Sequence, residues 1–326
     1  MRPRIVIAGT GFPVVRAFLE DALPVATLQA VDVEVLRRGF TADVLLPAMA
    51  RIDGELMAAI AGLRLVQQWG AGLEGVDISA ATARGIAVAN VPTAGTGNAE
   101  SVAEWCVLAA LALARRLHEA ERTIRAGTSW GIPAGRALLG STAGIVGLGG
   151  IGCALAARLK PFGMRLLAVR RRPDPALAAA LGLDWLGGMD ELPALLRRSD
   201  FVFLCVPLNS ETRGLVDARA LALLPPGAVI VNPGRGGVVS EDALVEALAS
   251  GRLAGAGLDV FEREPLDPGA PLLARDDVVA TPHVAGVTDA SYGGIARGVA
   301  ENVRRLFAGE PLRNCVNAEA LRSRAP

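Results

Sequence analysis

The sequence is poor in three residue types that carry much of protein chemistry: lysine, histidine and cysteine. Lys160 is the only lysine among 33 basic residues, which we interpret as a bias of genomic composition rather than a functional signal. The four cysteines lie far apart and form no Cys-x-x-Cys pair. This spacing argues against the common zinc and disulfide arrangements, so we expect reduced thiols and no metal site.

The chain also lacks an excess of charge and a long apolar run. Its formal net charge is +0, which argues against nucleic acid as a partner. The longest apolar run, Trp105 to Ala114, is much shorter than the roughly 20 residues that a membrane-spanning helix needs. No signal-peptide pattern precedes the first expected strand. We therefore expect a soluble cytoplasmic protein with no membrane partner.

Apolar residues are abundant, at 52%, and a chain of 326 residues favours two domains. Short apolar strands alternate with helical segments, which predicts an α/β fold with parallel sheets. In the first part, strands are expected at 5–8, 44–47, 65–67 and 87–89, and helices at 14–22, 54–61 and 78–83. Later strands are expected at 143–146, 164–169, 201–207, 228–232, 254–260 and 278–280, with helices at 240–250 and 292–307.

The segment from Ser141 to Arg172 carries the strongest functional pattern. An apolar strand leads into Gly147, Gly149 and Gly152, and a helix and a second strand follow. In dinucleotide-binding folds the first glycine permits the tight turn, the second lets the backbone approach a pyrophosphate, and the third lets the helix pack on the strand. The helix N-terminus adds N–H groups and partial positive charge. We therefore predict a dinucleotide cofactor at this turn.

A weaker pattern near the N-terminus predicts only an ordinary strand-to-helix turn. There Gly9 and Gly11 are followed by Val14 where a third glycine would stand, and Pro13 interrupts the segment.

Three further segments bear on the organisation of the chain. The glycine-rich loop from Gln67 to Asp77 offers backbone N–H groups to an anionic substrate group, although an ordinary connecting loop explains its spacing equally well. Asn90 to Gly97 is typical of a domain boundary. A long helix is expected from Ala99 to Ala126, apolar on almost all sides in its first half. Either a subunit interface or the interior of its own domain must cover that half.

Three residues at strand ends are candidates for chemistry. His283 follows the last expected strand, where ligands of open α/β sheets bind, and histidine exchanges protons near neutral pH. The other histidine, His118, lies on a helix and has no such position. Arg235 could bind a carboxylate in bidentate fashion and polarise the adjacent carbonyl. A carboxylate such as Glu264 beside His283 would orient its ring and favour the imidazolium.

Seven motifs in order resemble the D-isomer-specific 2-hydroxyacid dehydrogenase family, of the glyoxylate or hydroxypyruvate reductase type, over nearly the full chain. They are QQWGAGLEGVD, VPTAGTGNAESVAEW, GIVGLGGIG, CVPLNSETRGLV, VNPGRGGVVSEDAL, GLDVFEREPL and TPHVAGVT. The resemblance implies two Rossmann- or flavodoxin-like lobes. A dinucleotide-binding domain at 96–284 would be inserted into a discontinuous substrate-binding domain at 1–95 and 285–326. It also implies an active site in a cleft and a homodimer around the helix that starts at Ala99.

The resemblance further implies roles for individual residues. Arg235 would hold the substrate carboxylate and carbonyl, His283 would be the acid/base at the substrate oxygen, and Glu264 would be the partner of His283. The backbone at Ala71 and Gly72 would bind the substrate carboxylate, and Asp259 the nicotinamide carboxamide. The remaining implied cofactor contacts are Gly147, Gly149, Gly150, Ile151, Gly152, Val206, Pro207, Pro233, Gly234 and Gly286.

One position departs from the family pattern. Many members have aspartate at the end of the second cofactor strand, for the adenosine ribose hydroxyls, and here this position is Arg170, followed by two more arginines. An aspartate would repel a 2′-phosphate, whereas a guanidinium can bind it. We therefore favour NADP over NAD, the alternative being a solvated basic strand end. Ser240, where the family commonly has aspartate, is an exchange of one helix cap for another.

The expected function is an NAD(P)-dependent oxidoreductase that interconverts a small 2-keto acid and a D-2-hydroxy acid. Glyoxylate and hydroxypyruvate are the substrates favoured by the resemblance. One alternative is a dinucleotide-sensing corepressor of the same fold, for which longer flanking segments would be expected. Another is a phosphoglycerate dehydrogenase of the short type. Formate dehydrogenase fits less well, because that family pairs its histidine with glutamine.

Overall fold

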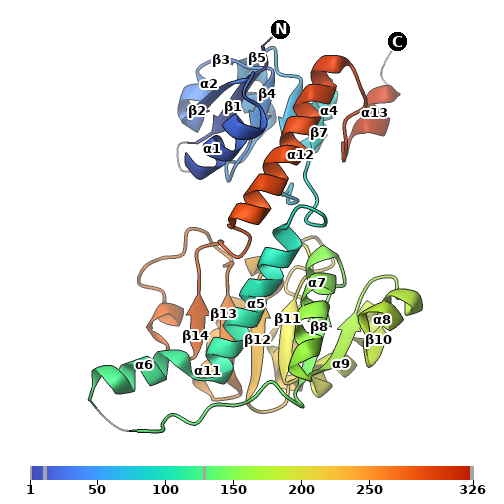
Figure 1. Ribbon diagram of the computed structural model, residues 1–326. Helices are drawn as coiled ribbons and strands as arrows, with labels where there is room; N and C mark the ends of the chain where they lie inside the picture. The colour runs from blue at the N-terminus through green and yellow to red at the C-terminus, as the bar shows by residue number, and fades with distance from the viewer. Residues whose placement is uncertain (1, 10–12, 128–129, 324–326) are drawn as a thin grey trace. The chain divides into compact units, whose positions relative to one another are not determined.

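The computed structural model describes residues 2–9, 13–127 and 130–323 and divides into two compact units (Figure 1). The first unit is formed by Met1–Asn98 and Thr288–Pro326, and the second by Ala99–Val287. Each unit is built on its own parallel sheet, which confirms the predicted α/β fold class. No helix of the described segments is long and apolar enough to cross a membrane.

The first unit has a five-stranded parallel sheet in the order β2-β1-β4-β6-β7. Its strands are β1 (Arg4–Ala8), β2 (Thr27–Val31), β4 (Val44–Leu46), β6 (Leu65–Gln67) and β7 (Ala87–Ala89). A separate pair joins β3 (Phe40–Thr41) to β5 (Ile60–Ala61). The helices are α1 (Pro13–Ala22), α2 (Val33–Arg37), α3 (Gly54–Ala59), α4 (Ile78–Ala83), α12 (Asp289–Ala308) and α13 (Ala318–Arg322).

Alternation along β1 shows why both faces of this sheet are covered. Ile5 and Ile7 pack with α1 and α12 in one cluster, whereas Val6 and Ala8 pack with α2, α3 and α4 in another. Successive side chains of a strand point to opposite faces, so an unbroken apolar strand requires helices on both.

The second unit has a seven-stranded parallel sheet in the order β10-β9-β8-β11-β12-β13-β14. The strands are β8 (Thr142–Val146), β9 (Arg165–Val169), β10 (Trp185–Gly187), β11 (Phe201–Leu204), β12 (Ala228–Asn232), β13 (Leu253–Leu258) and β14 (Val278–Ala280). The helices are α5 (Asn98–Ala114), α6 (Leu117–Arg125), α7 (Gly150–Leu159), α8 (Pro175–Leu181), α9 (Leu192–Arg198), α10 (Ala218–Leu223) and α11 (Glu241–Ala249). The short 3₁₀ turns are η1 (Lys160–Phe162), η2 (Met189–Glu191), η3 (Gly236–Val238) and η4 (Pro271–Ala274).

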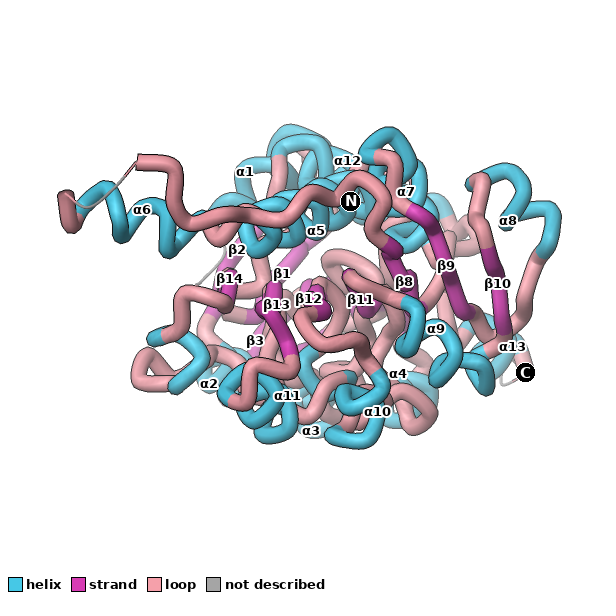
Figure 2. The backbone as a smooth tube through the Cα atoms, turned by 90° about the horizontal axis from the view of Figure 1, so that it is seen from below, coloured by secondary structure: helices cyan, strands magenta, loops and turns pink. Residues whose placement is uncertain are grey.

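Two apolar layers sandwich this sheet. Figure 2 shows α5 and α7 on one side of the strands and α9, α10 and α11 on the other. The strand order reverses between β8 and β11, which are neighbours although β9 and β10 come between them in sequence. Ligands of open α/β sheets bind beyond the strand ends at such a reversal.

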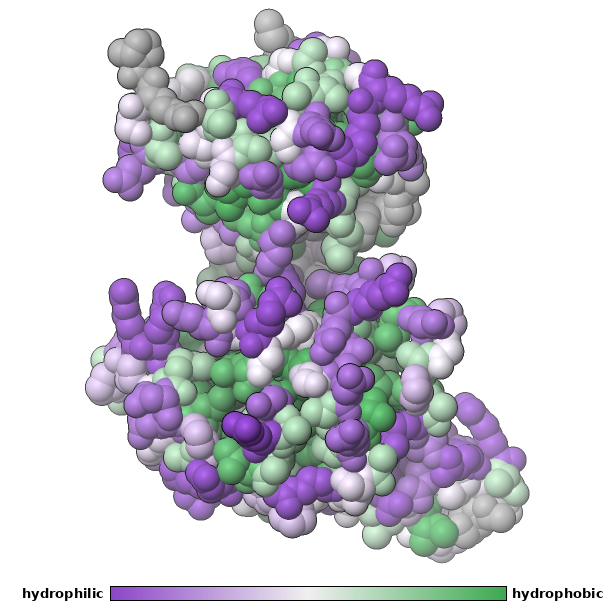
Figure 3. Space-filling model, turned by 180° about the vertical axis from the view of Figure 1, so that it is seen from behind, coloured by the Kyte–Doolittle hydropathy of each residue, from purple (hydrophilic) through white to green (hydrophobic). Residues whose placement is uncertain are grey.

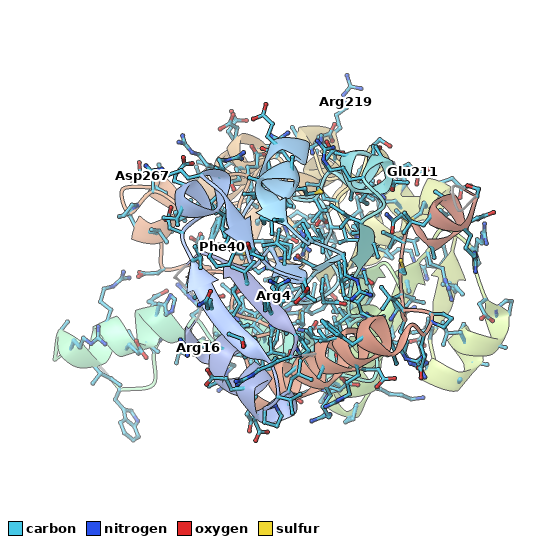
Figure 4. All side chains as sticks on the ribbon, turned by 90° about the horizontal axis from the view of Figure 1, so that it is seen from above. Arg4, Arg16, Phe40, Glu211, Arg219 and Asp267 are labelled. Carbon is cyan, nitrogen blue, oxygen red and sulfur yellow. The ribbon has the colours of Figure 1, made fainter. Side chains whose placement is uncertain are left out.

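Charged side chains such as Arg16 on α1 and Arg219 on α10 extend outward (Figure 4).

The long helix expected from Ala99 to Ala126 is wrong as a single element. The structure has α5 and α6 instead, with Arg116 between them in the left-handed conformation at φ 51°. In a continuous helix the Ala114 carbonyl would accept a hydrogen bond from the N–H of the residue four positions later. Here it accepts one from the N–H of Arg136 at 2.6 Å. The returning segment around residue 135 thus ends α5 from outside.

The first half of that helix is covered by its own unit. Trp105, Cys106, Ala109 and Leu113 of α5 are buried in the cluster that includes β8, β11 and β12. Of the two covers considered for this helix, the interior of the domain therefore accounts for most of its apolar surface. Leu108, at 58% exposed, is the main exception.

Other differences are smaller. Helix α3 ends at Ala59, because Ile60–Ala61 pairs with β3 instead of continuing it. The strand expected at 201–207 ends at Leu204, and the one expected at 254–260 spans 253–258. The sequence did not predict β2, an edge strand with one buried residue, nor α2 and β3. The N-terminal turn contains Gly11, which lies outside the described residues.

Candidate functional site

The glycine turn after β8 has the close approaches that its sequence predicts. Gly147 has φ 96°, and a Cβ there would lie 2.7 Å from the carbonyl oxygen of Cys205. A Cβ on Gly152 would collide with the carbonyl of Gly147. A Cβ on Gly149, in contrast, would have no neighbour among the described residues within 4 Å. Packing thus requires glycine at 147 and 152, while Gly149 faces open space.

This turn fits a pyrophosphate group. Gly149 is the N-cap of α7 and makes no side-chain cap hydrogen bond, so the first-turn N–H groups, which include Gly150 and Ile151, have no side-chain cap. Oriented backbone N–H groups and the positive end of the helix dipole favour an anion at such a terminus. The open space at Gly149 gives that anion room to approach.

Arg235 is held by the turn that follows β12. Its Nη1 donates to the Gly234 carbonyl at 2.7 Å. The buried Asn232 side chain donates to the Arg235 carbonyl at 3.0 Å and accepts from the Gly234 N–H at 3.1 Å. A Cβ on Gly236 would collide with the backbone of Phe261. This contact places the arginine turn directly against the loop that carries Glu264.

His283 and Glu264 are in direct contact. His283 Nδ1 lies 2.8 Å from Glu264 Oε2, and Glu264 Oε1 accepts the Phe261 N–H at 3.0 Å. Burial alone would raise the pKa of Glu264. The hydrogen bonds from His283 and Phe261, with the charges of His283 and Arg235, outweigh burial and lower that pKa below its ordinary value. Glu264 is therefore an ionised carboxylate near neutral pH, which can orient the imidazole.

Asp259 directly follows β13, beside the loop that carries His283, and is 1% exposed. Its carboxylate accepts hydrogen bonds from the loop that carries His283. Burial raises its pKa, and the bonds from Thr281, Ala285 and Val284 partly offset that effect.

The other predicted cofactor residues of this unit lie at the same ends of the strands. Val206 and Pro207 follow β11, Pro233 and Gly234 follow β12, and Gly286 follows the His283 loop. Arg170 directly follows β9 and is half-buried, and its charge acts to lower the pKa of Cys153 in the first turns of α7, although burial raises that pKa overall. Val169 pairs with Val146, and the Gly147 N–H donates to the Val169 carbonyl at 2.9 Å, so Arg170 begins beside the glycine turn.

Ala71 and Gly72 belong to the first unit. There the Gly70 carbonyl accepts the Val91 N–H at 2.9 Å, and the Ala71 carbonyl accepts Asn90 Nδ2 at 2.7 Å. Gly70 has φ 99°, a backbone conformation that glycine adopts without strain. The loop is therefore fixed through its carbonyls.

Sequence reasoning did not single out Asn232, Thr281 or Gly236. Asn232 and Gly236 shape the backbone turn that carries Arg235, and the Thr281 hydroxyl donates to the Asp259 carboxylate. Asn232 had one available signal, because an apolar strand that ends in a buried polar residue must pair that residue with something.

A family model described as "D-isomer specific 2-hydroxyacid dehydrogenase, NAD binding domain" matches residues 107–285, more than half of the chain. Among relatives, the D-3-phosphoglycerate dehydrogenase of Mycobacterium leprae is 41% identical over 281 residues, which cover 85% of this chain and 52% of that protein. This chain thus spans about half the length of that relative. The glyoxylate reductase of Korarchaeum cryptofilum is 40% identical over 283 residues, which cover 84% of this chain and 82% of that protein.

A solved structure gives the same picture of the fold. The D-lactate dehydrogenase of Aquifex aeolicus, crystallised with NAD and lactic acid, matches with a TM-score of 0.80 and 26% sequence identity. The match covers 94% of this chain and 96% of that one. These similarities agree with the resemblance that the seven motifs indicate.

Proposed function

Since this chain belongs to the D-isomer-specific 2-hydroxyacid dehydrogenase family, we propose that it interconverts a small 2-keto acid and the corresponding D-2-hydroxy acid with a nicotinamide cofactor. Glyoxylate and hydroxypyruvate are the substrates that we favour, because one of its similar relatives is named glyoxylate reductase. The observation that carries the proposal is the 2.8 Å contact between His283 Nδ1 and Glu264 Oε2, beside Arg235.

Each of these three residues has a role in the proposed reaction. Arg235 binds the substrate carboxylate and stabilises the charge that grows on the carbonyl oxygen in reduction. His283, as the imidazolium, donates a proton from Nε2 to that oxygen, while its Nδ1 is held by Glu264. The ionised Glu264 stabilises the imidazolium before transfer. When bound, the nicotinamide cofactor supplies the hydride for the carbonyl carbon. In oxidation, His283 takes the proton back.

The backbone at Ala71 and Gly72 is our proposed second contact for the substrate carboxylate. The anchoring of the Gly70 and Ala71 carbonyls supports this assignment, because the loop is already ordered before an anion binds.

The test of the reaction is an assay of the purified protein with glyoxylate, hydroxypyruvate, pyruvate and 3-phosphohydroxypyruvate, each with NADPH and with NADH. We expect the highest kcat/KM with glyoxylate or hydroxypyruvate. A preference for 3-phosphohydroxypyruvate would favour the second candidate function, phosphoglycerate dehydrogenase. The 41% identity to the M. leprae enzyme supports this candidate. Absence of turnover with every acid, together with cofactor binding, would favour a dinucleotide-sensing protein instead.

We also propose a preference for NADP, and the position of Arg170 supports it. The residue is half-buried, and it follows Val169, which pairs with Val146 and accepts the Gly147 N–H at the glycine turn. A guanidinium there can bind a 2′-phosphate, and such a charge-assisted bond is worth about 1.5–3 kcal/mol. This energy corresponds to a roughly 10- to 100-fold preference, reduced by solvent screening.

The variant Arg170→Asp tests this preference. We expect wild-type kcat/KM to be higher with NADPH than with NADH, and the ratio to fall as salt is raised. Arg170→Asp should reverse the ratio, because an aspartate repels the phosphate and accepts bonds from the ribose hydroxyls. Arg219→Asp on α10, whose side chain points outward in Figure 4, makes the same charge change elsewhere and should leave the ratio unaltered. A wild-type preference for NADH at low salt would contradict the proposal.

Finally, we propose that the protein is a homodimer and that the arm formed by residues 117–127 and 130–137 contributes to the interface. Helix α6 of this arm has no buried residue, and apolar side chains on the arm are exposed: Leu117, Ile124, Trp130 and Ile132. Figure 3 shows hydrophobic and hydrophilic residues side by side at this end of the second unit. A second copy would cover this surface.

A further inference from the structure

The backbone of His283 is in a conformation that needs support. Its φ is 56°, in the left-handed region that few residues other than glycine adopt. Such a residue persists only where its surroundings determine the conformation, and strained residues of this kind gather at functional sites. Hydrogen bonds to His283 and to its neighbours in the chain supply this support.

Asp259 supplies that support from both its backbone and its side chain. The Asp259 carbonyl accepts the His283 N–H at 2.8 Å. Before the histidine in the chain, the Thr281 hydroxyl donates to Asp259 Oδ1 at 2.6 Å. After it, the N–H of Val284 donates to Oδ1 and that of Ala285 to Oδ2, both at 2.8 Å. These four bonds fix the chain on both sides of His283.

The bonding pattern requires a carboxylate at this position. All three groups that reach the Asp259 side chain are donors, and both of its oxygens accept. An amide in its place would present an NH₂ group to at least one of these donors, and the mismatch would be buried. The residue is also 1% exposed, so water cannot replace a lost bond without rearrangement of the loop.

We propose that Asp259, acting through Thr281 and the backbone of residues 283–285, is a positioning residue that holds His283 where it can exchange a proton with the substrate and contact Glu264. The inference rests on the proposed acid/base role of His283. It adds a function to Asp259, for which the family resemblance implies only a contact with the nicotinamide carboxamide, and it assigns one to Thr281. A displacement of about 1 Å in a reacting group can lower a rate by roughly 10²-fold.

Thr281 allows the positioning role to be separated from a cofactor contact. Thr281→Val keeps the shape of the side chain and removes its hydroxyl, whereas Thr281→Ser keeps the hydroxyl. We expect Thr281→Val to lower kcat on the order of 10- to 100-fold with a cofactor dissociation constant within about twofold of the wild-type value. Thr281→Ser should restore most of the loss. Thermal unfolding of each variant checks that the fold is intact, and Thr281→Ala serves as a second variant without the hydroxyl.

Imidazole NMR spectra give a readout that does not depend on turnover. The chain has two histidines, so each ¹⁵N-labelled sample gives one signal set for His283 and one for His118. The His283 signals should shift or broaden in Thr281→Val and return in Thr281→Ser, while those of His118, on α6, stay in place.

The possible results separate two kinds of failure. Unchanged kcat and unchanged His283 signals in Thr281→Val and Thr281→Ala would overturn the positioning role. A raised cofactor dissociation constant with normal kcat would also overturn it, in favour of a purely cofactor-binding Asp259. Full activity of His283→Asn would instead refute the proposed function, and the NMR experiment would still decide whether Asp259 holds the loop.

Discussion

The pair formed by His283 and Glu264 makes a sharp prediction at the level of single residues. His283→Asn should lower kcat by at least about 10²-fold, the lower range for general acid–base catalysis, because asparagine cannot exchange the proton. His118→Asn is the matched control, because it makes the same chemical change on α6, away from the strand ends. Steady-state kinetics of the two variants at neutral pH is the measurement. Equal effects of both substitutions would refute the assignment.

The pKa of Glu264 gives the pair a defined pH behaviour. Because the folded-state pKa is lowered, the ionised form stabilises the folded state above the ordinary pKa of glutamate, and this contribution is lost as the pH falls through the lower folded value. Near neutral pH the Glu264 carboxylate is therefore charged and can accept a hydrogen bond from the imidazole.

Single residues also mark how far sequence reasoning reached into the site. Arg235, Glu264 and His283 were identified because each is a rare or charged type directly after an apolar strand. Asn232 and Thr281 were not, because the Asn232 side chain bonds to the Arg235 carbonyl and the Thr281 hydroxyl to the Asp259 carboxylate, and only the folded turns bring these partners together. The chemistry of a site was visible in the sequence, whereas its supporting hydrogen bonds required the structure.

At the level of elements, local patterns located most helices and strands but not their competition with distant segments. The cap at Ser240 was predicted from the sequence, and its hydroxyl accepts the Ala243 N–H at the start of α11. The break between α5 and α6 was not, because Arg136 takes the Ala114 carbonyl from 22 residues away. Strand β2 was not predicted, because an edge strand with one buried side chain has little apolar pattern.

Helix α3 carries a prediction that depends on pH. Asp53 accepts the Leu56 N–H as the helix cap and two bonds from the Arg37 guanidinium, and the Arg37 bonds, followed by that of Leu56, lower its pKa to about 2. The stability that the carboxylate adds is therefore present above the ordinary pKa of aspartate and is lost as the pH falls towards about 2. Urea unfolding of wild type and Asp53→Asn should differ at pH 6, and the difference should shrink by pH 3.

Two further variants control this experiment. Asp53→Ala removes the cap as well and should cost about 1 kcal/mol of unfolding free energy at pH 6. Arg37→Met leaves the cap but removes the ion pair. In an Arg37→Met background, the difference in unfolding free energy between proteins with and without the Asp53→Asn substitution should therefore depend less on pH. An Asp53→Asn effect that stays constant from pH 6 to pH 3 would mean that the ion pair adds nothing, as is common for partly exposed pairs.

At the level of the whole molecule, the proposed dimer concerns the arm formed by residues 117–127 and 130–137. Helix α6 has nine residues, none buried, and isolated helices of that length are marginal in water. Leu117, Ala120 and Ile124 lie three and four positions apart, so they share one helix face, and Ile124 is 78% exposed. This exposed apolar face is the basis of the proposed interface with a second copy.

Light scattering after size-exclusion chromatography at micromolar concentration should therefore report a dimer, and changes on the arm should weaken it. Ile124→Glu and Trp130→Ala should move the protein towards the monomer, because Trp130 is 98% exposed in a single copy and would be a large apolar anchor in an interface. Val25→Glu is the matched control, since Val25 is 63% exposed but belongs to the first unit and not to the arm. A monomeric wild type would refute the dimer, and a dimer that Val25→Glu and Ile124→Glu disrupt equally would show that its interface is not on the arm. In either case α6 would be held within its own subunit, where Arg122 pairs with Asp276.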